Sequence, residues 1–152
     1  PFVLGALKEA SNKSALTGLL VCNEISELNY VDHVISVVVG PEVITGSTRM
    51  KAGTATKLIL NMISTTLMIK LNKTYNNLMV DVNVSNTKLL DRGVRIISEL
   101  TSLNYNRSKE LLLSAKGDVK VAIIIFYHNC DYDDAINILE INSGNLKKSI
   151  QK

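Results

Sequence analysis

The sequence predicts an α/β protein in which a parallel sheet is followed by a purely helical C-terminal part. Two short apolar runs, 15–22 and 31–39, lack polar alternation, which is typical of parallel strands buried on both faces. A long apolar segment from Lys51 has the length of a helix, and beyond 103 the apolar periodicity is helical throughout. The order helix, strand, strand, helix is typical of half a doubly wound layer. We therefore expect one domain over 1–103 and a second over 104–152.

The first helix is expected from Pro1 to about Asn12, because apolar residues recur there at helical spacing and proline suits a first turn. The segment from Lys51 to about Leu71 is apolar on nearly every side, so its helix should pack inside the protein, against a sheet or a partner subunit. A homodimer is thus the default expectation. The four methionines, Met50, Met62, Met68 and Met79, are expected to lie in the core. The pattern over 73–77 predicts no element.

Asn86 is the predicted N-cap of a helix that runs to about Leu103. In the tail, the pair Gly117-Asp118 recurs in similar form as Gly144-Asn145. Each pair is followed by the beginning of an amphipathic helix. One interpretation is a compact bundle of ubiquitin-associated type, without any ubiquitin function; the alternative is two ordinary capped helices. The expected core of the tail comprises Leu111, Leu112, Val119, Ile123, Phe126, Ile136 and Leu139.

Composition excludes several classes of function. The 152 residues carry 17 Lys and Arg against 14 Asp and Glu, which indicates no nucleic-acid-binding or membrane-binding face. The longest uncharged apolar stretch, 58–69, is well short of the roughly 20 residues that a membrane span needs. Cys22 and Cys130 lie far apart and form no cluster with His33 or His128, so we expect no metal site, no disulfide and a cytoplasmic location. Both histidines are expected to be structural.

The candidate site is the segment from Gly40 to Lys51, called here the 40–51 loop, which leaves the second strand and enters the long helix. Ligands of α/β sheets bind at the carboxyl ends of strands, and a helix N-terminus presents free N–H groups to an anion. Ser47, Thr48, Arg49 and Lys51 would add hydroxyls and cations, so a phosphate or phosphosugar is the expected ligand. The spacing matches neither a P-loop nor a dinucleotide-binding turn.

An alternative remains open, in which Ser47 or Thr48 caps the helix and Arg49 and Lys51 are merely solvated. The helix dipole disfavours cations in a first turn by about 0.3 kcal/mol or more unless an anion is bound. This cost favours the anion site.

Two stretches carry a resemblance to a known family, Gly40-Pro-Glu-Val-Ile-Thr-Gly-Ser-Thr-Arg-Met-Lys-Ala-Gly-Thr-Ala55 and Tyr75-Asn-Asn-Leu-Met-Val-Asp-Val82. They resemble N-acetylmuramic acid 6-phosphate etherases, which are built on a sugar isomerase (SIS) domain. The resemblance implies the C-terminal half of a parallel-sheet, three-layer SIS sandwich. Gly46-Ser-Thr-Arg49 is also similar to the Ala-Ser-Thr-Lys loop of glucosamine-6-phosphate synthase isomerase domains, whose serine side contacts the sugar. The expected substrate-binding residues are Glu42, Gly46, Ser47, Thr48, Arg49 and Lys51.

The resemblance implies cleavage of the D-lactyl ether of N-acetylmuramic acid 6-phosphate, without a metal or redox cofactor. Such an elimination needs a general base and a general acid. The family's glutamates should lie upstream of Pro1, so no catalytic residue is assigned within 1–152 and this chain alone should be inactive. Glu42 is a single carboxylate and is expected to orient the loop or bind a sugar hydroxyl.

Two other functions remain open at this stage. A different class with the same fold is the phosphosugar sensor, represented by the glucokinase regulatory protein, which resembles the etherases but binds phosphosugars without converting them. The chain could also be an oligomerisation module, although that would leave the Ser-Thr-Arg-Met-Lys loop without a purpose. Whether the upstream glutamates are present would separate the enzyme from the sensor.

Overall fold

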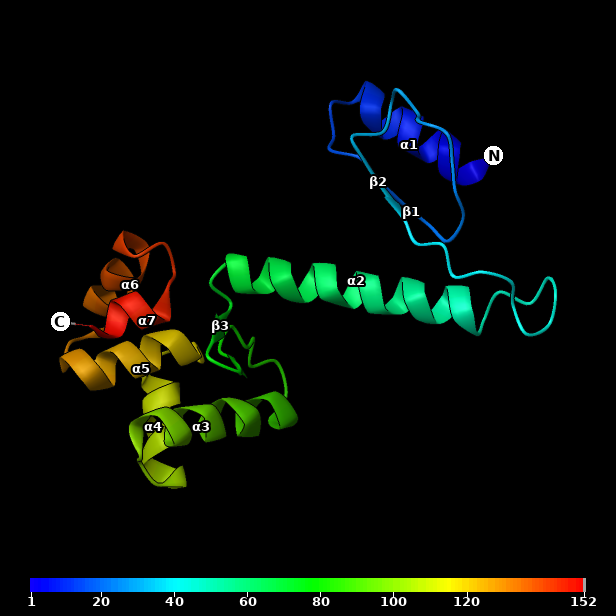
Figure 1. The fold of residues 1–152 in the computed structure, drawn as a ribbon. Coiled ribbons are helices and arrows are strands. Elements are labelled where there is room, and N and C mark those ends of the chain that lie inside the picture. Colours follow the sequence, from blue (N-terminus) through cyan, green and yellow to red (C-terminus); the bar gives the residue numbers. More distant parts are fainter. Residues whose placement is uncertain (152) are drawn as a thin grey trace. The chain divides into compact units, whose positions relative to one another are not determined.

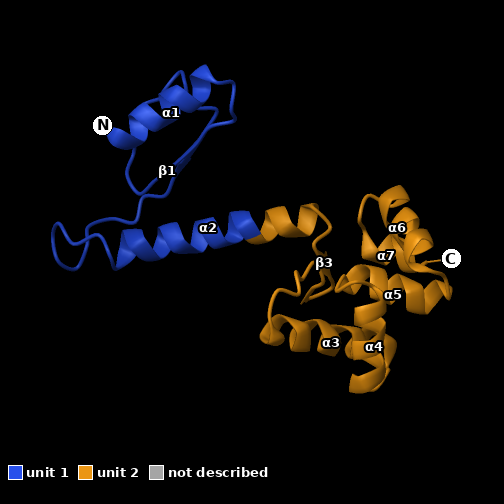
Figure 2. Ribbon diagram, turned by 180° about the vertical axis from the view of Figure 1, so that it is seen from behind, with its two compact units in different colours: residues 1–64 blue, residues 65–152 orange. Residues whose placement is uncertain are grey.

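The computed structural model describes residues 1–151, which form an α/β chain rich in helix with a few short strands. It divides into two compact units, Pro1–Ser64 and Thr65–Lys152 (Figure 2). The division falls inside one long helix. Each unit is described by itself below.

The first unit contains helix α1 (Phe2–Asn12), strands β1 (Gly18–Val21) and β2 (His33–Ser36), and most of helix α2 (Lys51–Lys70), as Figure 1 shows. Pro1 is the N-cap residue of α1, which confirms the predicted first helix. The strands pair in parallel, in register from Gly18 with His33 to Val21 with Ser36. The parallel pairing was predicted correctly, although both strands are shorter than the apolar runs that predicted them.

A side-chain contact fixes the start of this strand pair. The Asp32 carboxylate accepts hydrogen bonds from the backbone N–H of Thr17 at 2.7 Å and from its hydroxyl at 2.8 Å. The N–H of Asp32 in turn donates to the Thr17 hydroxyl at 3.0 Å. These two hydrogen bonds hold the pKa of Asp32 below its usual value, and the bond from the Thr17 backbone N–H has the larger effect. Both strands therefore begin at one defined register.

The expected burial of this apolar sequence is wrong for the chain taken alone. Leu19 is buried, but all four residues of β2 are exposed and α2 has no buried residue. The side chain of Met62 is 60% exposed, and Met50 and Met68 are exposed too, so these methionines do not fill a core. Two paired strands are too few to cover the apolar side chains of this unit.

In the second unit, the stretch without a sequence prediction forms a hairpin. Strands β3 (Thr74–Tyr75) and β4 (Leu78–Met79) pair antiparallel, with Thr74 opposite Met79. Asn76, in the two-residue turn, has φ of +52°, a left-handed conformation that asparagine tolerates better than most residues. Strands of two residues give too little periodicity for a sequence pattern to reveal them.

Five helices complete the second unit: α3 (Thr87–Thr101), α4 (Tyr105–Ser114), α5 (Val119–His128), α6 (Tyr132–Ile141) and α7 (Leu146–Ile150). Between residues 104 and 151 no strand occurs, as predicted. The predicted caps are confirmed: Asn86 accepts a hydrogen bond from the Leu89 N–H, Asp118 from Lys120 and Val121, and Asn145 from Lys148. The α3 helix ends at Thr101, slightly earlier than predicted, because Ser102 adopts a left-handed conformation.

The core of the second unit is built around α5. Its residues from Val119 to Ile124 are all buried, and side chains from α3, α4, α6 and α7 pack against them. Of the predicted core, Leu112, Val119, Ile123 and Leu139 are buried, and Leu111 and Ile136 are half-buried. The prediction for Phe126 is wrong: it lies near the end of α5, is 38% exposed and packs edge-to-face on Tyr127.

Candidate functional site

The 40–51 loop connects β2 with the N-terminus of α2. Gly40 and Gly46 have φ of +70° and +84°, in the left-handed region that glycine adopts without strain. These two residues let the chain turn away from the strand and back toward the helix. The loop is otherwise irregular up to Lys51.

Glu42 caps helix α2. One carboxylate oxygen, Oε2, accepts a hydrogen bond from the N–H of Lys51 at 3.0 Å, and Oε1 accepts one from the N–H of Ala52 at 3.1 Å. The two N–H groups lower the pKa of Glu42 below its usual value, and that of Lys51 has the larger effect. The cap is therefore Glu42, and the alternative in which the side chain of Ser47 or Thr48 caps the helix is wrong.

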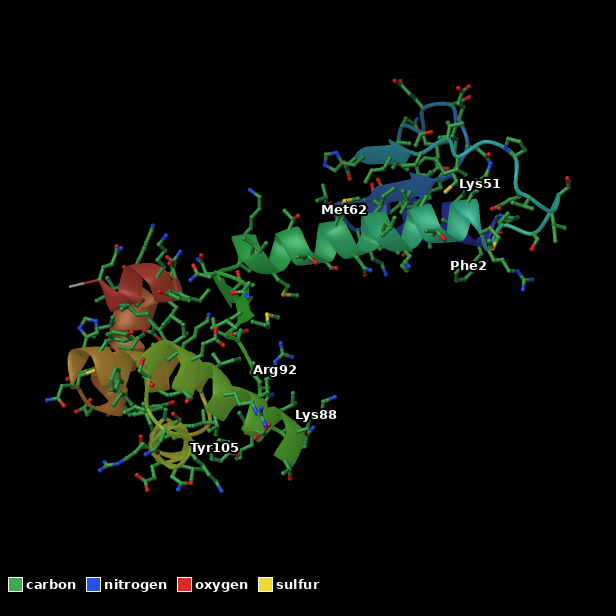
Figure 3. All side chains as sticks on the ribbon, turned by 60° about the horizontal axis from the view of Figure 1, so that its bottom comes forward. Phe2, Lys51, Met62, Lys88, Arg92 and Tyr105 are labelled. Atoms are coloured by element: carbon green, nitrogen blue, oxygen red, sulfur yellow. The ribbon has the colours of Figure 1, made fainter. Side chains whose placement is uncertain are left out.

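The remaining polar side chains of the loop are available to a ligand. The Arg49 Nε donates to the Ser47 hydroxyl at 3.1 Å, which brings these two predicted residues together. Thr48, Arg49 and Lys51 are exposed; Figure 3 shows Lys51 on the first turn of α2. Within residues 1–151, no carboxylate lies within ion-pair distance of Arg49 or Lys51. The charge of Lys51 still contributes to the lowered pKa of the nearby Glu42 carboxyl, although the two side chains form no ion pair among the described residues.

A hollow of about 440 Å³ lies beside these residues and is lined by Val43, Ile44, Ser47, Arg49 and Met50. Its lining combines apolar side chains with one hydroxyl and one guanidinium. That combination suits a sugar-sized ligand with an apolar face and an anionic group.

Cys22 contributes to this region, and sequence reasoning missed it. Its Sγ lies 3.6 Å from the Ala52 carbonyl and 3.6 Å from the Thr56 hydroxyl, so the carboxyl end of β1 contacts the first turns of α2. The Ser36 hydroxyl, at the end of β2, donates to the Asn23 carbonyl at 2.8 Å. The available signal was position, since Cys22 is the last residue of the apolar run 15–22 and directly follows β1. The carboxyl ends of both strands therefore lie at the edge where α/β sheets bind ligands.

The geometry changes the chemistry expected of this site. Because Glu42 already occupies the N–H groups of Lys51 and Ala52, these two groups are not available to an incoming anion. With its lowered pKa, Glu42 is ionised at neutral pH and is unsuited to act as a general acid.

His128 and the acidic residues at the start of α6 make structural contacts in the second unit. A ring nitrogen of His128, Nε2, lies 2.7 Å from the Ser149 carbonyl and links α5 to α7, as expected of a structural histidine. Asp131 caps α6, with Asp133 and Asp134 in its first turn. His, Cys, Asp and Glu side chains in residues 1–151 do not gather into a group that could bind a metal ion.

The family model for the C-terminal lid domain of glucokinase regulatory protein matches residues 76–121. The chain is 46% identical to N-acetylmuramic acid 6-phosphate etherase of Shouchella clausii, over 100% of this chain and 52% of that protein. The protein of the same name from Bacillus subtilis is 49% identical, over 99% of this chain and 50% of its own length. N-acetylmuramic acid 6-phosphate etherase 1 of Bacillus licheniformis is 50% identical with the same coverage.

None of the helices within residues 1–151 has the length and apolarity to cross a membrane. The chain spans about half the length of the curated relatives that it matches. Over its own length, the chain is similar to a half-length portion of proteins named N-acetylmuramic acid 6-phosphate etherase, at 46–50% identity.

Proposed function

We propose that the protein containing this chain is a lyase that cleaves the D-lactyl ether of N-acetylmuramic acid 6-phosphate. The products are N-acetylglucosamine 6-phosphate and D-lactate, as in the recycling of cell-wall amino sugars. The observation that carries this proposal is the identity of 46–50% with proteins named for that activity, extending over the whole chain. The exposed cations and hydroxyls of the 40–51 loop support it.

The reaction proceeds by elimination followed by addition of water. Opening of the sugar ring exposes an aldehyde at C1, which acidifies the proton at C2. A general base removes that proton, and D-lactate leaves from C3 with a proton from a general acid. Water then adds across the resulting double bond to give the product. The base and the acid are each worth about 10²–10⁴ in rate.

In this proposal the 40–51 loop binds the substrate and supplies no catalytic group. Ser47 and Thr48 donate to sugar or phosphate oxygens, while Arg49 and Lys51 neutralise an anionic group of the substrate. Glu42 holds the loop on α2, and Gly46 lets the backbone approach the ligand. The catalytic acid and base come from parts of the protein outside 1–152, and neither metal nor redox cofactor is required.

The architecture proposed for the whole protein follows the family resemblance. Residues 1–103 would form the C-terminal portion of a three-layer SIS sandwich, and 104–152 a ubiquitin-associated-like bundle. The parallel pair β1–β2 and the capped helices α4 to α7 support this assignment. The exposed apolar side chains of α2 support a homodimer. The proposal also includes a cytoplasmic location, a phosphosugar as substrate and no nucleic acid as partner.

A second candidate is a phosphosugar sensor that binds without turnover. The match of residues 76–121 to the lid domain of glucokinase regulatory protein favours it. An assay for release of D-lactate from N-acetylmuramic acid 6-phosphate by the purified full-length protein tests both the etherase and the sensor. Release at enzymatic rates supports the etherase, whereas binding of N-acetylglucosamine 6-phosphate without any release of D-lactate would establish the sensor.

A further inference from the structure

A buried ammonium group joins three segments of the second unit. The side chain of Lys120, on α5, is only 8% exposed. Its Nζ donates to the carbonyl of Asn72, just after α2, at 2.8 Å and to the carbonyl of Gly144, between α6 and α7, at 3.1 Å. It also lies 3.5 Å from a carboxylate oxygen of Asp81, which pairs in addition with Lys73.

Asn72 completes this network with its side chain. Its Nδ2 donates to the Ser143 carbonyl at 3.1 Å, and its Oδ1 accepts a hydrogen bond from Asn145 Nδ2 at 2.9 Å. Asn145 also caps α7, because its Oδ1 accepts a hydrogen bond from the Lys148 N–H at 3.0 Å. The turn between α6 and α7 is thereby attached both to Lys120 and to the residue that follows α2.

The physics of burial makes this network cooperative. A buried ammonium is tolerated only while its partners stay in place, and a partly satisfied polar network is worse than an apolar one. If the α6–α7 turn moves away, Lys120 loses one carbonyl and Asn72 loses both side-chain partners. If the 72–81 segment moves away, the same ammonium loses the other carbonyl and the Asp81 carboxylate. Each departure therefore weakens the attachment of the other segment.

We infer that Lys120, Asn72 and Asn145 form a latch that makes the 72–81 hairpin segment and the α6–α7 region one cooperative opening unit. In this inference α3 and α4 stay folded when the unit opens, although they share one apolar core around α5 with α6, α7 and the hairpin. The matched family segment, 76–121, contains Lys120 but neither Asn72 nor Asn145. The latch therefore ties α6 and α7 to the hairpin through residues on both sides of that segment.

Hydrogen exchange of the full-length protein, read by mass spectrometry, tests the latch through two reporter amides. The Val80 N–H donates to the Lys73 carbonyl at 3.1 Å in the hairpin, and the Gly144 N–H donates to the Leu139 carbonyl at 2.8 Å at the end of α6. The main variant is Asn145→Ser, because serine is an equally good N-cap but lacks the amide that reaches Asn72. Its matched control is Asn104→Ser, which changes the N-cap of α4, where the side chain accepts only the Arg107 N–H.

In Asn145→Ser we expect both reporter amides to exchange about 2- to 10-fold faster, the effect of one lost hydrogen bond, with α3 unchanged. Lys120→Met, which keeps the apolar stem and removes the ammonium, should accelerate both by more than about tenfold. In Asn104→Ser neither reporter should change. Faster exchange at Gly144 with unchanged exchange at Val80 in Asn145→Ser would overturn the inference, even if Lys120→Met failed to fold. The readout does not depend on the proposed enzymatic activity.

Discussion

The Glu42 carboxylate accepts a hydrogen bond from the backbone N–H of Lys51 at 3.0 Å, so one predicted site residue fixes the position of another. The same carboxylate binds the N–H of Ala52. The side chain of Glu42 therefore ties the 40–51 loop to the start of α2. This contact separates the role of Glu42, which shapes the loop, from that proposed for Lys51, which meets the ligand.

The Glu42 cap predicts a dependence of stability on pH. Its pKa is lowered from the usual 4.5 in the folded state, so the cap contributes fully above pH 4.5 and is lost as pH falls through the folded value. In Glu42→Gln this part of the pH dependence should disappear, because the amide does not titrate. Thermal melts of wild type and variant between pH 7 and acid, with Glu24→Gln as an exposed control, measure it. Identical pH dependence in wild type and Glu42→Gln would refute the role of the cap.

Replacing Lys51 by alanine should weaken ligand binding while leaving stability almost unchanged. A charge-assisted hydrogen bond is worth about 1.5–3 kcal/mol, which corresponds to about 10- to 150-fold in affinity. An exposed cation in the first turn opposes the helix dipole, so its loss costs the empty protein little. Calorimetric titration of N-acetylglucosamine 6-phosphate into full-length wild type and Lys51→Ala measures the change.

Lys57→Ala is the matched control for Lys51, because it removes an exposed lysine from the same helix away from the 40–51 loop. Its affinity should equal that of the wild type. If Lys51→Ala kept full affinity but melted at a lower temperature, Lys51 would be structural and most of the case for this loop as the site would be lost.

Residues 1–152 expressed on their own should release no D-lactate from N-acetylmuramic acid 6-phosphate. The elimination needs both a base and an acid, and the Glu42 carboxylate of the loop is already engaged at the N-terminus of α2. An enzymatic assay for D-lactate on protein free of host etherase, with the full-length protein as positive control, checks this. Turnover by residues 1–152 alone would place the catalytic pair within them.

Truncation of the fully buried Ile123 to alanine should destabilise the second unit by about 2–5 kcal/mol, because it removes apolar contacts and leaves a cavity in the core. Ile141→Ala is the control, since that side chain is 82% exposed and should change the unfolding free energy by less than about 0.5 kcal/mol. Denaturant unfolding of both variants gives the comparison. Similar losses at the two positions would contradict the core described here.

Local sequence signals were sufficient for three of the five helix starts of the second unit. Asn86, Asp118 and Asn145 each cap a helix through N–H groups two or three residues away, so the pattern that predicts the cap also contains its partner. The two-residue strands of the hairpin carried no such signal. Phe126 was misplaced because helical periodicity gives the face of α5 but not the point where the neighbouring helices end.

The sequence by itself determined the parallel pairing of β1 and β2, the helical tail and the polar composition of the 40–51 loop, because each depends on residue types within one short window. Only the tertiary structure decided that Glu42 caps α2 and that Lys120 is held by Asn72, Gly144 and Asp81. These contacts join residues that are distant along the chain. Their partners are chosen by the path of the backbone and by the need to satisfy polar groups on folding, which no local pattern records.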